Sequence, residues 1–211
     1  KDGIIWASQI EDPSAFGVVK LNNENIITDF VEKPETFISD LAIIGIYYFN
    51  DGEYLKNELQ YLLDNNIKDK GEFQLTNALE NMKNKGTNFS AGEVEEWLDC
   101  GNKDATVFTN GRVLAHNGSV ISDSANIENS EIIEPCFIGE RVKIQNSKIG
   151  PHVSIGEKTV INNSAIENTI VQDNSIITQA KLKNSMIGSQ VVFNGKNTEQ
   201  EISIGDFSEV K

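Results

Sequence analysis

The chain has 211 residues, of which 38% are hydrophobic and 24% charged, a balance typical of globular proteins with a buried core. Its formal net charge of −14 disfavours binding to a phosphate backbone, so nucleic acid is not an expected partner. The sequence has no apolar run near the ~18 residues of a membrane span, and its start lacks the order of a signal peptide. We therefore expect a cytoplasmic protein of two domains, without a membrane partner.

The first half of the sequence alternates strand and helix patterns. Three apolar runs predict strands, at residues 16–21, 26–31 and 42–49. The last run is unbroken, which predicts a strand buried on both faces. Apolar residues at helical spacing predict helices over 52–66 and 75–82, and a third helix is expected from about Asn102. Because the chain already starts in a strand, without an opening βα unit, we expect an α/β lobe that is incomplete at its beginning.

Isoleucines recur every 17 residues in the second half, in three interleaved series. The series are Ile121, Ile138 and Ile155; Ile127, Ile144 and Ile161; and Ile132, Ile149 and Ile166. They predict coils of three short strands, each of which points one isoleucine into a triangular prism. Ordinary alternating strands have a period of two and would not keep this register. We therefore expect an all-β parallel β-helix over 116–211, following the lobe at 1–115, and self-association through its exposed coil faces or open end.

Glycine and asparagine recur between the isoleucines, where tight corners favour a positive φ. These repeats resemble those of the hexapeptide-repeat family, whose β-helices are left-handed. Such β-helices occur in acyltransferases and as tails of sugar-nucleotide enzymes. The resemblance covers the second half of the chain and implies a left-handed parallel β-helix.

Short motifs of the first half carry the candidate chemistry. Gly17 lies in the segment 12–19, where the lack of a side chain would let a ligand approach the backbone. Glu32 could accept hydrogen bonds from hydroxyl groups, and Lys33 could balance a negative charge. Adjacent strand residues point to opposite faces, so Lys33 can serve this site only if the strand ends there. Pro34 makes that ending plausible.

With the segments 39–47, 71–77 and 96–101, these motifs resemble the second half of a sugar-1-phosphate nucleotidylyltransferase of the glucose-1-phosphate thymidylyltransferase type. The resemblance implies a substrate-binding set of Gly17, Glu32, Lys33, Asp40, Gly45 and Trp97. It also implies that Asp99 binds Mg²⁺ together with a second aspartate from the family's amino-terminal half. Asp40 and Ile44 depart from the family, which has asparagine and often threonine there.

Each motif also has a structural interpretation. Gly17 could be a plain turn glycine, and Glu32 and Lys33 a solvated strand exit. Glu72 could act at a helix N-terminus, and Asp99 could cap the helix that begins near Asn102. The order and spacing of the motifs together favour the substrate-binding interpretation.

The resemblance implies that a nucleoside triphosphate and a sugar-1-phosphate, by preference dTTP and glucose-1-phosphate, react with release of pyrophosphate. Catalysis would come from Mg²⁺, charge neutralisation and positioning, in a protein expected to be a homo-oligomer. The family's Gly-rich loop and first metal aspartate are missing from this sequence, so we expect the fold to be an incomplete nucleotidyltransferase Rossmann-like lobe that is inactive alone. Two alternatives stay open: an acyltransferase that uses His152 or His116 as a general base, and a non-catalytic regulatory or oligomerisation subunit.

Overall fold

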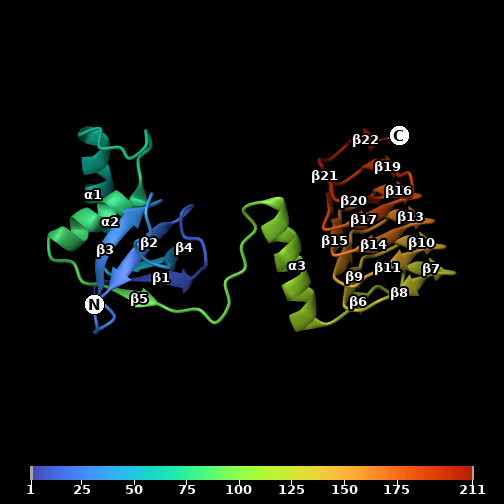
Figure 1. Ribbon diagram of the computed structural model, residues 1–211, viewed down its shortest axis with the longest axis horizontal. Helices are drawn as coiled ribbons and strands as arrows, with labels where there is room; N and C mark the ends of the chain where they lie inside the picture. Colours follow the sequence, from blue (N-terminus) through green and yellow to red (C-terminus); the bar gives the residue numbers. More distant parts are fainter. Residues whose placement is uncertain (1, 211) are drawn as a thin grey trace. The chain divides into compact units, whose positions relative to one another are not determined.

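The computed structural model describes residues 2–210, which form two compact units that divide between Trp97 and Leu98. The first unit is built on a five-stranded sheet of order β3-β2-β4-β1-β5 (Figure 1). Its strands are β1 (Gly3–Gln9), β2 (Gly17–Leu21), β3 (Ile27–Glu32), β4 (Leu41–Phe49) and β5 (Phe89–Gly92). Its helices are α1 (Gly52–Asp64) and α2 (Leu75–Asn84). The strand and helix predictions are confirmed to within a few residues, and β5 is an element that they missed.

The prediction that residues 42–49 form a strand buried on both faces is wrong. Ile46 and Tyr48 of β4 are 49% and 52% exposed. The strand pairs antiparallel with β1 and β2, an arrangement in which one face of a sheet can remain open to solvent. The register also shifts between Ile5 and Ala7 of β1, opposite Gly45, whose φ is +81°. The unbroken apolar run at residues 42–49 therefore did not indicate a strand of a parallel sheet, which would be buried on both faces.

The core of the first unit lies between the sheet and α2. Phe89 packs edge-on against both Phe30 and Phe49, with ring centroids 5.7 and 6.0 Å apart. Leu79 and Met82 of α2 are buried in the same cluster. This packing holds α2 beside β3, the strand that ends in the candidate site residue Glu32.

The second unit is a parallel β-solenoid with three sheets, which we name the first, second and third faces (Figure 1). The first face contains β7 (Asn126–Glu128), β10 (Lys143–Gln145), β13 (Val160–Asn162), β16 (Ile176–Thr178), β19 (Val192–Asn194) and β22 (Glu209–Val210). The second contains β8 (Glu131–Ile132), β11 (Lys148–Ile149), β14 (Ala165–Glu167), β17 (Lys181–Lys183) and β20 (Glu199–Gln200). The third contains β6 (Val120–Ile121), β9 (Cys136–Ile138), β12 (Val153–Ile155), β15 (Thr169–Val171), β18 (Met186–Ile187) and β21 (Ser203–Ile204). Helix α3 (Lys103–Asn117) packs on β12 and β15 of the third face.

The three isoleucine series are confirmed as ladders of residues in register. Ile144, for example, pairs with Ile127 below and Ile161 above, and Ile144 and Ile161 are fully buried. The ladder continues through Ile177 and Phe193, where the repeat shortens to 16 residues. Each apolar side chain thus contacts its equivalents in adjacent coils, and the stack forms one continuous core. The left-handed sense of the coils stays a prediction.

Asparagines and serines shape the corners as the repeat predicts. Asn129, Asn146 and Asn163 have φ values of 45°, 50° and 49°, in the left-handed region that asparagine tolerates. The Asn129 amide donates to Asn146 Oδ1 at 2.6 Å. Ser147 N donates to Ser130 Oγ one coil away at 3.0 Å. The corners are therefore linked by hydrogen bonds between coils, in addition to the strand ladders.

Within residues 2–210, no helix has both the length and the apolar character that a bilayer crossing requires.

Candidate functional site

A carboxylate, a threonine and a glycine meet where β2, β3 and α2 come together. The antiparallel register places Gly17 of β2 opposite Glu32 of β3. Thr76 Oγ1, in the first turn of α2, donates to Glu32 Oε2 at 2.9 Å. A Cβ on Gly17 would lie 2.9 Å from Thr76 Cγ2 and 3.0 Å from Glu32 Oε2. Gly17 is therefore required for the close packing that holds the Glu32 carboxylate, a role more specific than that of a plain turn.

Lys33 lies just beyond the end of β3, which is the condition set for its participation in the site. Its φ is +39°, and its N–H donates to Phe16 O at 3.0 Å. Lys33 Nζ is 3.9 Å from Glu32 Oε1. The Glu32 side chain is only 12% exposed, whereas that of Lys33 is 45% exposed. An anchored, largely buried carboxylate and a more exposed ammonium thus lie side by side at the strand exit.

Two further residues, Tyr47 and Thr76, belong to the group around Glu32. Both lie in segments that the sequence motifs identified, but the motifs indicated other residues of those segments. Tyr47 of β4 has a pKa raised first by burial and then by the negative charge of Glu32. Thr76 holds Glu32, although the segment 71–77 directed attention to Glu72. Glu72 instead accepts from Gln74 Nε2 at 3.2 Å, and Gln74, the N-cap of α2, makes no side-chain capping bond. The sequence contained no signal for Thr76, because its burial and its contact with Glu32 arise only when α2 packs on β3.

Trp97 lies at the edge of the same group. Its ring packs edge-on against Phe16, with centroids 5.4 Å apart and planes at 80°. Phe16 directly precedes Gly17, and its carbonyl accepts the Lys33 N–H. Trp97 is thereby connected, through one aromatic contact, to the backbone that shapes the group.

The other two expected substrate contacts lie outside the hydrogen-bonded group of Glu32. Asp40 Oδ2 accepts from Gln9 Nε2 at 2.6 Å, and Asp40 O accepts from Ile10 N at 2.9 Å, so Asp40 ties the start of β4 to the end of β1. Gly45 is exposed, and a Cβ there would meet no atom within 4 Å. Its positive φ, rather than close packing, requires glycine at this position.

Asp99 lies near the start of the second unit, shortly before α3, which begins at Lys103. Its carbonyl accepts from Thr109 Oγ1 at 2.6 Å, which fixes the backbone of Asp99 to the helix. The N-cap of α3 is Asn102, whose side chain accepts from Ala105 N at 2.9 Å. The alternative that Asp99 caps this helix is therefore wrong, and its half-buried carboxylate is not used for capping.

The surroundings of the Asp99 carboxylate decide whether the described residues form a metal site. Residues 2–210 contain no group of three or more His, Cys, Asp or Glu side chains that could hold a metal ion. Mg²⁺ in phosphoryl-transfer sites is commonly bound by one or two carboxylates, with phosphate oxygens and water completing its ligands. The Asp99 carboxylate thus fits one ligand position of such a site, and the part of the chain that the structure describes does not complete it.

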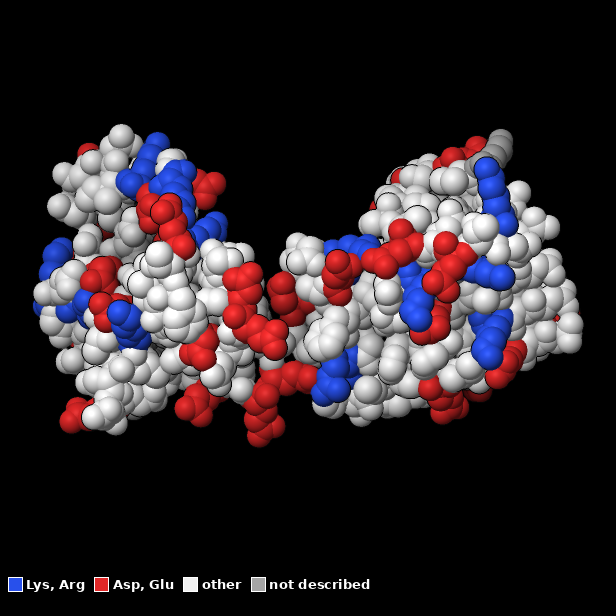
Figure 2. Space-filling view, in the orientation of Figure 1, with Lys and Arg blue, Asp and Glu red and all other residues white. Residues whose placement is uncertain are grey.

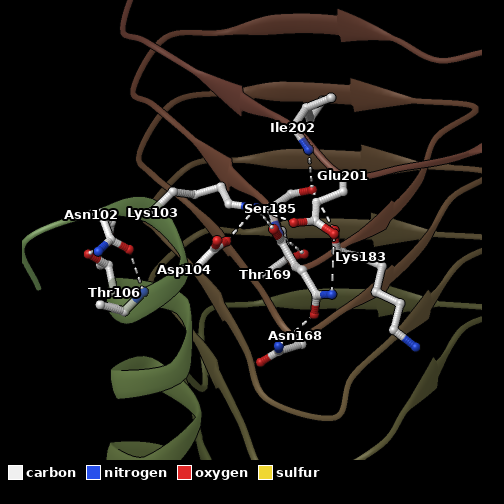
Figure 3. Close-up of polar contacts among 12 residues, drawn as sticks. Asn102, Lys103, Asp104, Thr106, Asn168, Thr169, Lys183, Ser185, Glu201 and Ile202 are labelled. Carbon is white, nitrogen blue, oxygen red and sulfur yellow. Dashed lines mark hydrogen bonds and ion pairs between the residues drawn. The ribbon is translucent and has the colours of Figure 1, made fainter. Parts of the chain in front are cut away.

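An ion cluster ties the start of α3 to the β-solenoid (Figure 3). Lys103 Nζ lies 2.7 Å from Asp104 Oδ1, donates to Asn184 O at 3.0 Å and forms an ion pair with Glu201. Asn168 Nδ2 donates in turn to Asn184 Oδ1 at 2.8 Å. The hydrogen bond from Lys103, followed by that from Asn184, lowers the pKa of Glu201. This cluster positions the helix that follows Asp99.

Replacing Glu201 by glutamine is expected to weaken the docking of α3 in a pH-dependent manner. Because the folded-state pKa of Glu201 is lowered, its charge stabilises the fold above the unfolded-state pKa, near ~4.3, and this contribution disappears as the pH falls through the folded-state value. Urea unfolding of both proteins between pH 3 and pH 7 measures the effect. The difference should be present at neutral pH and shrink toward pH 3; a difference independent of pH would contradict it.

A groove of about 560 Å³ lies within the second unit, between α3 and the coils. It is lined in part by Phe108, Arg112, His152 and Glu167, and by none of the expected substrate-binding residues. A Cβ on Gly111 of α3 would lie 3.6 Å from His152 Cβ, so the histidine is partly covered by the helix. His116 lies in the last turn of α3 and does not line the groove. Of the two histidines, only His152 faces this groove, where the helix covers part of it.

A match to a family model shows the class of protein to which the chain belongs. The family model for nucleotidyl transferases matches residues 2–114, more than half of the chain. The chain therefore belongs to the nucleotidyl transferase family. The match includes α3, although by its contacts this helix packs with the second unit.

The chain is also similar to individual proteins of known description. A glucose-1-phosphate thymidylyltransferase from Streptomyces antibioticus is 28% identical over 152 residues, which cover 64% of this chain and 41% of the relative. A bifunctional sugar-1-phosphate nucleotidylyltransferase/acetyltransferase from Sulfurisphaera tokodaii is 29% identical over 140 residues, covering 64% and 33%. The chain thus spans well under half the length of these relatives. A solved structure described as a glucose-1-phosphate thymidylyltransferase from Bacillus anthracis is 22% identical, covers 57% of this chain and 46% of that one, and has a TM-score of 0.44.

Proposed function

We propose that the first unit binds the sugar-1-phosphate in a nucleotidylyltransferase, which joins it to a nucleoside triphosphate and releases pyrophosphate. Family membership supports the reaction class. The observation that carries the sugar-binding role is the Glu32 carboxylate, held by Thr76 over Gly17 and paired with Lys33. dTTP and glucose-1-phosphate are the proposed substrates, because the Streptomyces relative is named for them.

The chemistry of the group suits a sugar phosphate. Glu32 Oε2 accepts from Thr76, which leaves Oε1 and the remaining lone pairs for sugar hydroxyls. Lys33 is exposed enough to reach a phosphate, and its ammonium would offset the phosphate charge. Tyr47, whose raised pKa keeps the phenol protonated at neutral pH, would be a hydrogen-bond donor near the carboxylate. Trp97 would form an apolar wall beside Gly17.

Asp99 is proposed as a ligand of Mg²⁺, which would neutralise phosphate charge in the bound substrates. The carboxylate suits this ion, and the position precedes a helix whose start is fixed by Asn102 and Lys103. We further propose that the protein acts in the cytoplasm, where nucleoside triphosphates are available, and that it self-associates.

Replacing Glu32 by glutamine tests the sugar-binding role directly. Glutamine keeps the shape but removes the charge, so we expect glucose-1-phosphate to bind roughly 10-fold to 100-fold more weakly. Isothermal titration of the 211-residue chain measures this. The control is Glu53→Gln, the same change at an exposed position of α1, which should leave the affinity unchanged. Equal affinities for the parent and the Glu32 variant would count against the proposal.

A coupled assay of pyrophosphate release tests the reaction. It should use several triphosphates and sugar-1-phosphates, with the chain alone and with any segment that the gene encodes before Lys1. Release with one preferred pair would identify the substrates. Release with no pair in the longest protein would contradict the nucleotidylyltransferase proposal.

A second candidate is acyl transfer by the β-solenoid, favoured by the acetyltransferase named in the Sulfurisphaera relative and by the groove beside His152. The packing of Gly111 against His152 makes it the weaker candidate. Acyl transfer that is abolished by His152→Ala would support it, and transfer that survives this change would dispose of it.

A further inference from the structure

The groove between α3 and the coils, which we name the α3 groove, is elongated and has two unlike walls. The helix wall extends from Asp104 to Ala115, which is roughly 16 Å at the rise of an α-helix. The coil wall extends from His152 to Glu201 along one corner of the solenoid. These two residues are three coils apart, which is roughly 14 Å at the usual spacing of strands. The two walls therefore run side by side over a similar length.

The helix wall contains an exposed aromatic ring. Phe108 is 61% exposed although it lines a concave part of the surface. Gly111 and Ala115, which line the same wall, add little side-chain volume. The ring therefore offers a flat apolar surface, which a ligand with an apolar face can cover.

The coil wall offers oxygen atoms as hydrogen-bond acceptors. Asn168 Nδ2 donates to Asn184 Oδ1 at 2.8 Å. Asn168 Oδ1 is directed toward α3, since a Cβ on Gly111 would lie 3.5 Å from it. Glu167 and Glu201 are exposed, and a carboxylate has about four lone-pair sites, so one ion pair leaves sites for other donors. The coil wall thus suits a ligand that donates several hydrogen bonds.

The charged side chains of the groove already have partners of opposite charge within the second unit. The ion pairs are those of Asp104 and Glu201 with Lys103 (Figure 3), and that of Glu167 with Lys183 at 3.1 Å. Arg112, which also lines the groove, has an interaction within the chain as well. In Figure 2, acidic and basic side chains are interspersed over the visible face of the second unit. The groove therefore has little net charge with which to attract an ion.

We propose that the α3 groove binds an uncharged oligosaccharide. A pyranose ring has a C–H face that would pack on Phe108, and its hydroxyl groups would donate to Glu167 and Asn168. A purely apolar ligand would remove water from the coil wall without replacing its hydrogen bonds. The groove is longer than one hexose ring, and its volume of about 560 Å³ lies within the usual range of ligand sites. This ligand and site are separate from the sugar-1-phosphate proposed for the group around Glu32.

Nuclear magnetic resonance titration of the 211-residue chain with cellotriose and with maltotriose tests the site. Both are neutral glucose trisaccharides, and they differ in the configuration of their linkages. We expect at least one to bind with a dissociation constant of about 1 mM or less, and to shift the amide signals of α3 and of Asn168 and Asn184. No saturable shift with either sugar up to about 20 mM, or shifts confined to the first unit, would overturn the proposal.

Replacing Phe108 by alanine tests the packing of the sugar on the aromatic ring. We expect the bound trisaccharide to dissociate about 5-fold to 10-fold more readily at equilibrium, because its apolar face loses the ring. The control is Phe37→Ala, which removes a ring that is 74% exposed in the first unit and should leave the affinity unchanged. Circular dichroism checks that both variants are folded. Equal affinities of the parent and the Phe108 variant would contradict the proposed site.

Two substitutions at a single ion pair test the coil wall. Glu167→Ala and Lys183→Ala each remove the ion pair between these residues, but only Glu167 lines the α3 groove. We expect Glu167→Ala to weaken trisaccharide binding about 3-fold to 10-fold, and Lys183→Ala to have little effect. Equal weakening by both would mean that the effect acts through the solenoid, and would overturn the proposed contact.

The charge of the ligand is tested with the trimer of glucosamine, which carries ammonium groups. Because the carboxylates of the groove are already paired, this trimer should bind no more tightly than the neutral trisaccharide. A clear preference for the charged trimer would overturn the proposed ligand class. Glu32→Gln should leave trisaccharide binding at the α3 groove unchanged, so its outcome is independent of the proposed nucleotidyl transfer.

Discussion

Replacing Gly150 by alanine is expected to lower the free energy of unfolding of the β-solenoid by more than about 4 kcal/mol. Gly150 has a φ of +107°, and a Cβ there would lie 1.9 Å from Ile133 O and 2.9 Å from Cys136 Sγ. The backbone cannot move away easily, because Gly150 N donates to Ile166 O at 2.8 Å in the adjacent coil. The clash is with main-chain atoms of the stack, so relief requires a shift of a whole coil.

Gly205→Ala is the matched control for this prediction. A Cβ at Gly205 would meet no atom within 4 Å, and its φ lies outside the positive region. The substitution should change stability by less than about 1 kcal/mol, and it can stabilise slightly by restricting the unfolded chain. Urea unfolding followed by circular dichroism measures both variants. Equal stability of the two would show that the corner at Gly150 tolerates a side chain after all.

Replacing Asp99 by asparagine is expected to reduce pyrophosphate release by the whole protein roughly 10²-fold to 10³-fold, if Asp99 binds Mg²⁺ as proposed. Asparagine keeps the size of the side chain but lacks the charge that a hard cation prefers. The Mg²⁺ concentration that gives half-maximal activity should rise as well, which a purely structural defect would not cause. Asn102 caps α3, so the substitution should leave the helix in place.

Asp123→Asn provides the control, since it makes the same change at an exposed position of the β-solenoid. It should leave both the rate and the Mg²⁺ requirement unchanged. If Asp99→Asn lowered the rate without a change in Mg²⁺ requirement, its role as a metal ligand would be wrong, and a role in orienting α3 would remain.

The two halves of the chain differ in how far their structure follows from local sequence. In the β-solenoid, each apolar residue contacts the equivalent residues one repeat away. The sequence period therefore predicts both the strands and the strands with which they pair. The ladders through Ile144 and Ile149 were therefore predictable residue by residue. In the first unit, periodicity identified the strands and helices but not their neighbours. The exposure of Ile46 on β4 depended on antiparallel pairing and on a shift in register opposite Gly45.

The candidate site shows the same division. Residue type and order were enough to identify Glu32 and Lys33, and the strand exit between them is confirmed. The partner of Glu32 was not predictable, because Thr76 lies 44 residues away and meets it only when α2 packs on β3. The proximity of Tyr47 to Glu32 likewise follows from the sheet.

The sequence by itself determined the 17-residue repeat, the family motifs and the adjacent carboxylate and ammonium of Glu32 and Lys33. These features depend only on the spacing and the type of residues. Only the tertiary structure decided which groups hold Glu32 and that Asn102 rather than Asp99 caps α3. The physical reason is that hydrogen bonds, burial and charge complementarity act between surfaces. Those surfaces exist only after distant segments of the chain have packed together.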